Sequence, residues 1–278
     1  MNTTEAIYTR SIRKVNADTL SIQDDFLAVE EPLEISLLYT EKGQRLRKKI
    51  SVTMRTPSHD DELALGFLFT EGIIQHYDQI KTVNSNALDP NKVLVTLKDQ
   101  AAPVLHTSER NFYTTSSCGV CGKASIEAIK TTALFSLSEA HTVIPHELFF
   151  DIFHQIKNKQ EVFQQTGGLH ASFLFDYNGN FIMLREDVGR HNALDKLIGA
   201  AFMNNTLPLH NSILLLSGRA SFELIQKAKM AGIGIVAAIG APSSLAVELA
   251  EECGMTLLGF LGRDRFNIYT DFARIKDI

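Results

Sequence analysis

Hydrophobic and polar positions in the last third of the chain alternate between short apolar runs and segments with helical spacing. The apolar runs at 212–216, 234–239 and 255–261 are bounded by glycine or small polar residues, which is typical of buried strands. Segments 220–230 and 243–253 carry apolar residues every three or four positions, which is typical of helices. The alternation predicts a parallel sheet with right-handed crossovers.

A hairpin between two helices is predicted just upstream. Its strands are the apolar segments 171–175 and 181–185, and Asn178-Gly179 between them is a strong turn signal. The helix before it is amphipathic and covers 145–156.

The first part of the chain has short segments typical of strands. Four strands and one helix are predicted there, at 32–39, 50–54, 80–83 and 92–97 for the strands and at 63–70 for the helix. Residues 1–30 are polar and are predicted to be a loosely attached lead-in. We therefore expect an α/β protein in two parts: a smaller β-rich domain with one helix at 1–110, and a larger α/β domain at 111–278 with a parallel or mixed sheet.

Composition narrows the function classes. The chain of 278 residues is 45% hydrophobic and 21% charged, with 27 Lys and Arg against 32 Asp and Glu. The net charge of −5 does not favour nucleic-acid binding. No apolar run reaches the length of a membrane span, and Met1–Glu5 does not begin a signal peptide. The expected location is the cytosol, where thiols stay reduced.

The segment T-T-S-S-C-G-V-C-G-K at 114–123 holds Cys118 and Cys121, two of the three cysteines. Its hydroxyl residues predict a solvated loop, and the residues from Lys123 onward predict a helix. A helix start and a nearby lysine both stabilise a thiolate.

Four interpretations of this cysteine pair compete. The cysteines are incidental, or they bind structural zinc, or they form a redox dithiol, or one of them is a nucleophile that carries sulfur. Zinc needs four ligands, and the remaining Cys253 lies in an apolar helical pattern. A thioredoxin-type dithiol belongs after a strand of a small fold near the N-terminus, unlike this mid-chain loop.

The densest polar cluster follows the hairpin, where E-D-V-G-R-H-N-A-L-D-K at 186–196 becomes a helix. An acidic helix start alone would explain part of it. Asp187, Arg190 and His191 together exceed what capping requires, so we expect them to form a site. Arg190 and the helix start suit a phosphate or another anion.

Ligands of parallel sheets bind beyond the carboxyl ends of the strands. These ends offer small residues, Ser221, and three arginines: Arg219, Arg263 and Arg265. No P-loop or G-x-G-x-x-G motif is present. We expect a pocket for a phosphorylated or nucleotide-like ligand; the alternative is that each arginine pairs with an acid at the rim of the sheet.

Five segments together resemble the FdhD family of formate dehydrogenase accessory sulfurtransferases. They are C-G-V-C-G, T-G-G-L-H, E-D-V-G-R-H-N-A-L-D-K, S-G-R-A-S-F-E-L and G-F-L-G-R-D-R-F-N-I-Y-T. The resemblance implies a core similar to that of cytidine deaminases. It also implies that a cysteine desulfurase donates persulfide sulfur. The sulfur then passes to the molybdenum or tungsten bis(pterin guanine dinucleotide) cofactor of formate dehydrogenase, which is bound as a substrate.

The resemblance also implies roles for individual residues. Cys118 corresponds to the persulfide cysteine and Cys121 to its partner. The cofactor-binding segment near the C-terminus corresponds to Phe260, Leu261, Gly262, Arg263, Asp264 and Arg265. No permanently bound metal is expected.

Two rival functions stay open. A zinc nucleobase deaminase would use C-x-x-C but also needs H-x-E, and none of the nine histidines is followed by x-Glu. A chaperone could deliver the molybdenum cofactor without sulfur chemistry. We further expect a homodimer, because symmetric dimers are common and the cofactor has two guanylate arms. No nucleic-acid or membrane partner is expected.

Overall fold

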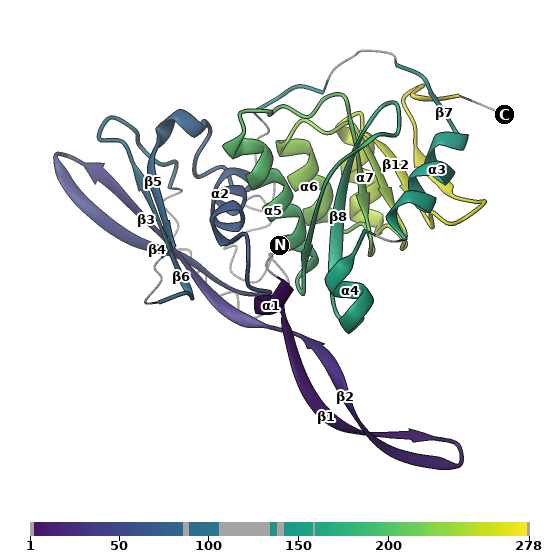
Figure 1. The fold of residues 1–278 in the computed structure, drawn as a ribbon. Coiled ribbons are helices and arrows are strands. Elements are labelled where there is room, and N and C mark those ends of the chain that lie inside the picture. The colour runs from purple at the N-terminus through teal and green to yellow at the C-terminus, as the bar shows by residue number, and fades with distance from the viewer. Residues whose placement is uncertain (1–2, 86–88, 106–133, 138–141, 158, 277–278) are drawn as a thin grey trace.

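The computed structural model describes residues 3–85, 89–105, 134–137, 142–157 and 159–276. It confirms the α/β class (Figure 1). The domain boundary expected near residue 110 lies outside the described residues. No helix in the described ranges is long and apolar enough to cross a membrane.

The larger sheet has six strands in the order β13-β12-β11-β10-β8-β9. Their bounds are β8 (His170–Asp176), β9 (Phe181–Asp187), β10 (Ser212–Leu216), β11 (Ile235–Ala238), β12 (Thr256–Gly259) and β13 (Asn267–Thr270). β10, β11 and β12 are parallel, as the sequence predicts, while β8, β9 and β13 run antiparallel to their neighbours. The sheet is therefore mixed, and its carboxyl edge includes the start of β8.

Helices cover both faces of this sheet. One face packs on α5 (Arg190–Met203), α6 (Phe222–Met230) and α7 (Ser244–Glu252), and the other on α3 (Glu147–Ile156). Alternate strand residues enter the two cores: Leu214 and Leu216 face α5 and α6, whereas Ile213 and Leu215 face α3. This alternation follows from the two-residue period of a strand. The short helix α4 (Glu161–Thr166) leads into β8.

The N-terminal part holds a four-stranded sheet in the order β4-β3-β6-β5. Its elements are β3 (Glu31–Glu41), β4 (Gln44–Arg55), α2 (Asp60–Thr70), a 3-10 turn η1 (Tyr77–Gln79), β5 (Ile80–Ser85) and β6 (Lys92–Leu97). A small parallel pair joins β7 (Ile144–Pro145) to β14 (Ile275–Lys276).

Helices α2 and α5 lie between the two sheets and join them (Figure 1). The two helices cross closely because each presents a glycine to the backbone of the other. A Cβ built on Gly66 would lie 1.9 Å from the carbonyl oxygen of Asp195, and a Cβ built on Gly199 would lie 1.8 Å from the carbonyl oxygen of Glu62. One buried apolar cluster therefore runs from Leu33 in β3 to Leu257 in β12.

The prediction that residues 1–30 form a loosely attached polar lead-in is wrong. After α1 (Thr3–Ala6), the chain forms the antiparallel hairpin of β1 (Ile7–Asn16) and β2 (Thr19–Ala28). Figure 1 shows it projecting away from both sheets. Most of its side chains are exposed, and in β2 the alternation of apolar residues is interrupted at Asp24-Asp25, so the pattern of a half-buried strand is weak.

Candidate functional site

Three loops meet where β10, β11 and β12 end. Residues 217–221 follow β10, 240–243 follow β11, and 260–265 follow β12. Backbone hydrogen bonds hold them side by side, since Gly240 N donates to Gly218 O and Phe260 N donates to Gly240 O, at 3.0 and 3.2 Å. The strand ends expected to bind a ligand are thus one continuous edge.

The three arginines of this edge point outward from it. Arg219, Arg263 and Arg265 are exposed, and within the described ranges none of them forms an ion pair with a carboxylate. The alternative that each arginine pairs with an acid at the rim is therefore not seen in this part of the chain. A guanidinium group that is not paired with a carboxylate is suited to bidentate contacts with phosphate.

The rest of the segment 260–265 forms a tight turn. Phe260 has a left-handed φ of 54° and a ring that is 46% exposed. Leu261 is buried, and its N–H donates to Ala238 O at 3.0 Å. Gly262 N donates to Arg265 O at 2.9 Å, and Asp264 is exposed between the two arginines. This turn directs Phe260, Arg263 and Arg265 toward solvent, while Leu261 anchors it.

The starts of α5, α6 and α7 lie at the same edge. Ser243 caps α7 by accepting from Ala246 N at 3.3 Å. Ser221, at the start of α6, makes no such cap, and its Oγ lies 3.4 Å from Nε2 of His191. Helix starts carry partial positive charge and favour an anion there.

His191 and Glu223 form the closest polar pair of the edge. His191 Nε2 lies 2.8 Å from Glu223 Oε2, and both side chains are largely buried. Burial opposes the charge on Glu223, but the hydrogen bond to His191 together with the charges of His191, Lys227 and Arg190 outweighs it and lowers the pKa of this carboxyl. The pair can hold a proton between α5 and α6.

His170 and Arg190 complete this cluster. Gly218 lies against the ring of His170: a Cβ on this glycine would lie 3.2 Å from His170 Nδ1. Burial, with the nearby charges of Arg190 and His191, lowers the pKa of His170 and favours its neutral form. The Nε of Arg190 is buried and has no hydrogen-bond partner among the described residues. An anion at this point would satisfy it.

Asp187 has a different position from its neighbours. Its carboxylate is fully buried and lies 2.7 Å from Lys196 Nζ. It also accepts from Thr56 N, Gly189 N and Asn192 Nδ2 at 3.2, 2.8 and 3.1 Å. All of these partners belong to the protein, so Asp187 fixes the start of α5 and holds Arg190 and His191 in place.

Glu223 and His170 were not among the residues that the sequence singled out. Both residues are far from His191 along the chain. His170 reaches this edge because β8 runs antiparallel to β10, and Glu223 meets His191 because α5 and α6 begin at the same edge. Both occur in the segments T-G-G-L-H and S-F-E-L, which was the available signal. Cys118 and Cys121 lie outside the described residues; Cys253 is described and is a half-buried free thiol.

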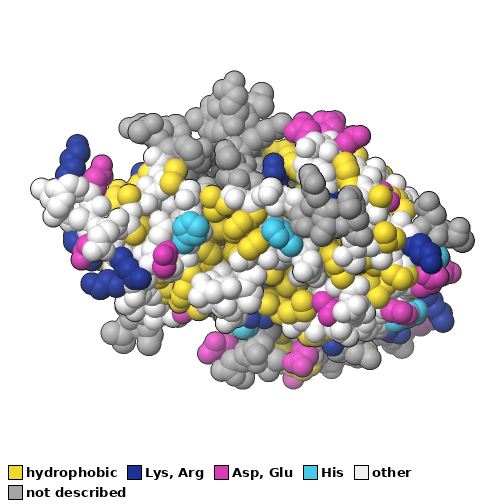
Figure 2. All heavy atoms as spheres, turned by 90° about the horizontal axis from the view of Figure 1, so that it is seen from above, with side chains coloured by type: hydrophobic (Ala, Val, Ile, Leu, Met, Phe, Trp, Pro, Cys, Tyr) yellow, Lys and Arg dark blue, Asp and Glu magenta, His cyan; other side chains and the backbone are white. Residues whose placement is uncertain are grey.

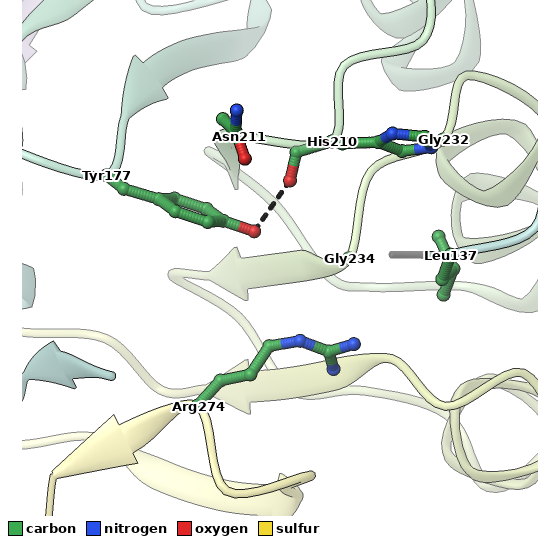
Figure 3. A pocket seen from close by; sticks show the side chains of 7 residues that line it. All are labelled: Leu137, Tyr177, His210, Asn211, Gly232, Gly234 and Arg274. Carbon is green, nitrogen blue, oxygen red and sulfur yellow. Dashed lines mark hydrogen bonds between the residues drawn. The ribbon is translucent and has the colours of Figure 1, made fainter. Parts of the chain in front are cut away.

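Two hollows lined by described residues lie away from this edge. Figure 3 shows one at the opposite ends of β10 and β11, where the Tyr177 hydroxyl donates to His210 O at 2.7 Å. Its volume of about 10 Å³ has room for roughly one water. A larger, acidic hollow of about 650 Å³ lies at the start of α2 and includes Glu31, Asp60 and Glu62. Apolar side chains gather on the upper face between two histidines (Figure 2).

The structure is that of a mixed α/β protein in which strand ends, helix starts and exposed arginines gather at one edge of the larger sheet. The chain belongs to the FdhD/NarQ family, whose sequence profile matches residues 28–276. This confirms the resemblance seen in the sequence.

Named relatives cover almost the whole chain. It is 45% identical over 274 residues to a Streptomyces coelicolor protein named Sulfur carrier protein FdhD, covering 96% of this chain and 94% of that one. A protein of the same name from Mycobacterium tuberculosis is 44% identical over 276 residues, covering 96% and 97%.

A relative of the same name from Sulfurisphaera tokodaii is 40% identical over 262 residues, covering 94% and 96%. A solved structure from Desulfotalea psychrophila, proposed to be a formate dehydrogenase accessory protein, superposes with a TM-score of 0.73. It is 22% identical and covers 98% of this chain and 100% of that one, which confirms the fold. The likeness to cytidine deaminases stays a prediction.

Proposed function

We propose that this protein is a sulfur carrier that supports formate dehydrogenase. It accepts sulfur from a cysteine desulfurase on Cys118 and passes it to the molybdenum or tungsten bis(pterin guanine dinucleotide) cofactor. The relatives named sulfur carrier protein support the carrier role. The cytosol suits it, since a thiol carrier needs a reducing compartment.

One observation carries the cofactor part of the proposal. The guanidinium groups of Arg219, Arg263 and Arg265 stand at one edge without carboxylate partners in the described part of the chain. A guanine dinucleotide brings pyrophosphates that pair with such groups. Phe260 offers an exposed ring against which the guanine base can stack.

The sulfur chemistry is redox-neutral in its first step. The Cys118 thiolate attacks the outer sulfur of the donor's persulfide, the S–S bond of the donor breaks, and the donor leaves as a thiolate. Release of the sulfur from Cys118 as hydrosulfide needs a second nucleophile that supplies an electron pair. If Cys121 attacks the inner sulfur, hydrosulfide leaves and a disulfide forms, which a cellular dithiol must reduce before the next cycle.

The His191–Glu223 pair has a place in this scheme. A thiol must lose its proton to act as a nucleophile, and a histidine paired with a carboxylate can take that proton. Ser221 and Arg190 then hold the anionic end of the substrate beside it. Asp187 contributes by fixing the start of α5.

Nucleotide binding tests the cofactor site. We expect calorimetry to detect weak binding of guanosine diphosphate, and we expect the double change Arg263→Ala, Arg265→Ala to weaken it at least tenfold. The matched control is Arg45→Ala, since Arg45 is a partly exposed arginine of the other sheet that pairs with Asp99 at 2.7 Å. Absence of binding at millimolar nucleotide by folded protein, or equal loss in the control, would contradict the site.

A further inference from the structure

The turn at 260–265 is anchored on both sides by apolar side chains. On one side, Leu261 is buried in the core that the sheet shares with α3. On the other side, the ring of Phe266 packs on two rings of α3, those of Phe149 and Phe150, with centroid distances of 5.4 and 5.5 Å. The side chains between these anchors are therefore presented from a fixed piece of backbone, which selective recognition of a ligand requires.

The tip of this turn carries a carboxylate between two guanidinium groups. Gly262 N donates to Arg265 O at 2.9 Å, which leaves Arg263 and Asp264 at the tip. Asp264 is exposed and forms no ion pair with either arginine in the described part of the chain. A site for phosphate alone would not place an unpaired carboxylate there, because like charges repel. The carboxylate suits a part of the ligand that donates hydrogen bonds.

Phe260 indicates where that part of the ligand lies. Its ring is 46% exposed at the start of the turn, and an exposed aromatic ring is a surface on which a nucleobase stacks. Phe260 and Asp264 are four residues apart, a distance of at most roughly 14 Å in an extended chain, and the turn makes it shorter. A base stacked on Phe260 therefore has its hydrogen-bonding edge within reach of the Asp264 carboxylate.

The donor and acceptor pattern of each base decides which one fits a carboxylate. Guanine has two adjacent donors on its Watson–Crick edge, the N1–H and the 2-amino group, and a carboxylate can accept from both. Adenine and cytosine each have an amino donor beside a ring nitrogen that only accepts, so one of their two contacts with a carboxylate is repulsive. Uracil has one donor between two carbonyl oxygens. Guanine is therefore the base that matches the tip of this turn.

We propose that Asp264 is the residue that selects guanine at this edge. Its carboxylate accepts hydrogen bonds from the N1–H and the 2-amino group of a guanine that stacks on Phe260. The inference rests on the proposed function, since the guanine belongs to the cofactor. Arg263 and Arg265 then contact the pyrophosphate, which every nucleoside diphosphate carries. The arginines thus supply affinity for any such nucleotide, and Asp264 supplies the preference for guanine.

Calorimetry on the full chain with a series of nucleoside diphosphates tests this selection. Guanosine diphosphate offers both donors, inosine diphosphate lacks the 2-amino group, and adenosine diphosphate has an acceptor at N1. A bidentate contact to a base discriminates by roughly 5- to 150-fold. We therefore expect the wild type to bind guanosine diphosphate at least about fivefold more tightly than adenosine diphosphate, with inosine diphosphate between the two.

The variant Asp264→Asn should change the preferred base, a result that loss of folding cannot imitate. The asparagine amide accepts from N1–H and donates from Nδ2. This pattern matches xanthine, which has a carbonyl oxygen in place of the 2-amino group of guanine. We expect Asp264→Asn to lose the preference for guanosine over adenosine diphosphate and to bind xanthosine diphosphate at least about fivefold more tightly than the wild type does. The control Glu248→Gln removes the same charge from an exposed residue of α7 and should keep the wild-type order.

The outcomes separate this inference from the proposed function. If the folded wild type binds none of these nucleotides at millimolar concentration, the cofactor site itself is contradicted. If the wild type binds guanosine and adenosine diphosphate equally, the cofactor site stands and the selection of guanine by Asp264 is overturned. The same holds if Asp264→Asn keeps the preference for guanosine diphosphate and gains no affinity for xanthosine diphosphate. An equal change in Glu248→Gln would show an effect of net charge and would also overturn the inference.

Discussion

Asp187 and Lys196 form a buried ion pair at the start of α5, the helix that carries Arg190 and His191. Both side chains are fully buried, and Lys196 Nζ also donates to Thr56 O at 2.8 Å. Burial raises the pKa of Asp187, while Lys196 and the hydrogen bonds from Gly189 and Asn192 oppose that shift. We expect Asp187→Ala to lower the free energy of unfolding by about 3–5 kcal/mol, because it leaves a buried ammonium unpaired. Urea denaturation measures this loss.

The double variant Asp187→Leu, Lys196→Met is the matched control. It removes both charges and should recover most of the lost stability. By contrast, Arg219→Ala should change stability by less than about 0.5 kcal/mol, since an exposed side chain is removed. An Asp187→Ala protein as stable as wild type would show that the pair is not structural.

At the residue scale, the sequence predicted which segment holds the polar side chains of the candidate site. It did not predict which of these side chains lie at the edge of the sheet and which are buried. The segment 186–196 was predicted as a site, and the structure places Arg190 and His191 at the edge of the sheet. Asp187 points inward instead, because the last residue of β9 meets Thr56, the residue that follows β4. Such a contact across 131 residues of chain leaves no local signal. Glu223 was missed for the same reason.

At the crossing of α2 and α5 the backbones of the two helices are in close contact. We expect Gly66→Ala to destabilise the fold by about 3 kcal/mol or more, because the methyl group would overlap the backbone of Asp195. Helix propensity alone predicts the opposite, a gain of about 1 kcal/mol. Thermal unfolding decides between the two.

Gly168→Ala is the control for this change. Its added Cβ would meet the Ala28 side chain at 3.4 Å, an ordinary contact. A Gly66→Ala protein with unchanged or raised melting temperature would mean that the helices separate without cost.

The ion pair between α2 and β9 predicts a pH dependence. Burial opposes ionisation of Glu62, but Arg185, which donates from Nη2 at 2.7 Å, and His59 outweigh it and lower the pKa from 4.5 to about 2. A carboxyl with a lowered folded-state pKa stabilises the protein above its unfolded pKa, and that contribution is lost as the pH falls toward the folded value. We expect a loss of about 3 kcal/mol from this group between pH 5 and pH 2.

The variant Arg185→Gln should show a clearly smaller loss over the same range, measured as urea midpoints at each pH. If the wild type and Arg185→Gln lose the same stability between pH 5 and pH 2, Glu62 is not the group responsible for the pH dependence.

Among the elements, the buried strands were the easiest to predict. β10 occupies the predicted residues 212–216. A short apolar run between polar turns is typical of a buried strand. The β1–β2 hairpin was missed because charged residues interrupt its apolar positions, as Asp24-Asp25 does in β2. The strand β13 was missed as well; three of its four residues are exposed.

At the scale of the whole molecule, the two sheets share one core. Residues of β3, α2, α5 and β12 belong to the same apolar cluster, so neither sheet can lose its packing alone. We expect a single unfolding transition in calorimetry, with equal calorimetric and van't Hoff enthalpies. Two resolved transitions would show that the N-terminal part, expected at 1–110, unfolds as an independent domain.

The order of the strands could not be predicted from the sequence. Alternating strands and helices indicated a parallel sheet, and that holds for β10 to β12. The hairpin β8–β9 joins this sheet antiparallel beside β10, which brings His170 to the carboxyl edge. The sequence of a hairpin does not indicate which strand it will pair with. The position of His170 at the carboxyl edge could therefore be seen only in the structure.

The central claim is that Cys118 carries sulfur, and intact mass spectrometry tests it most directly. The protein is incubated with a cysteine desulfurase and cysteine, and the mass is measured before and after reduction. We expect a reducible gain of about 32 Da, one sulfur atom, mapped to Cys118, present in Cys253→Ala and absent in Cys118→Ala. No gain in the wild type, or a gain that maps to Cys253, would contradict the claim. If Cys118→Ala and Cys121→Ala then still activated formate dehydrogenase, a chaperone without sulfur chemistry would be the better account.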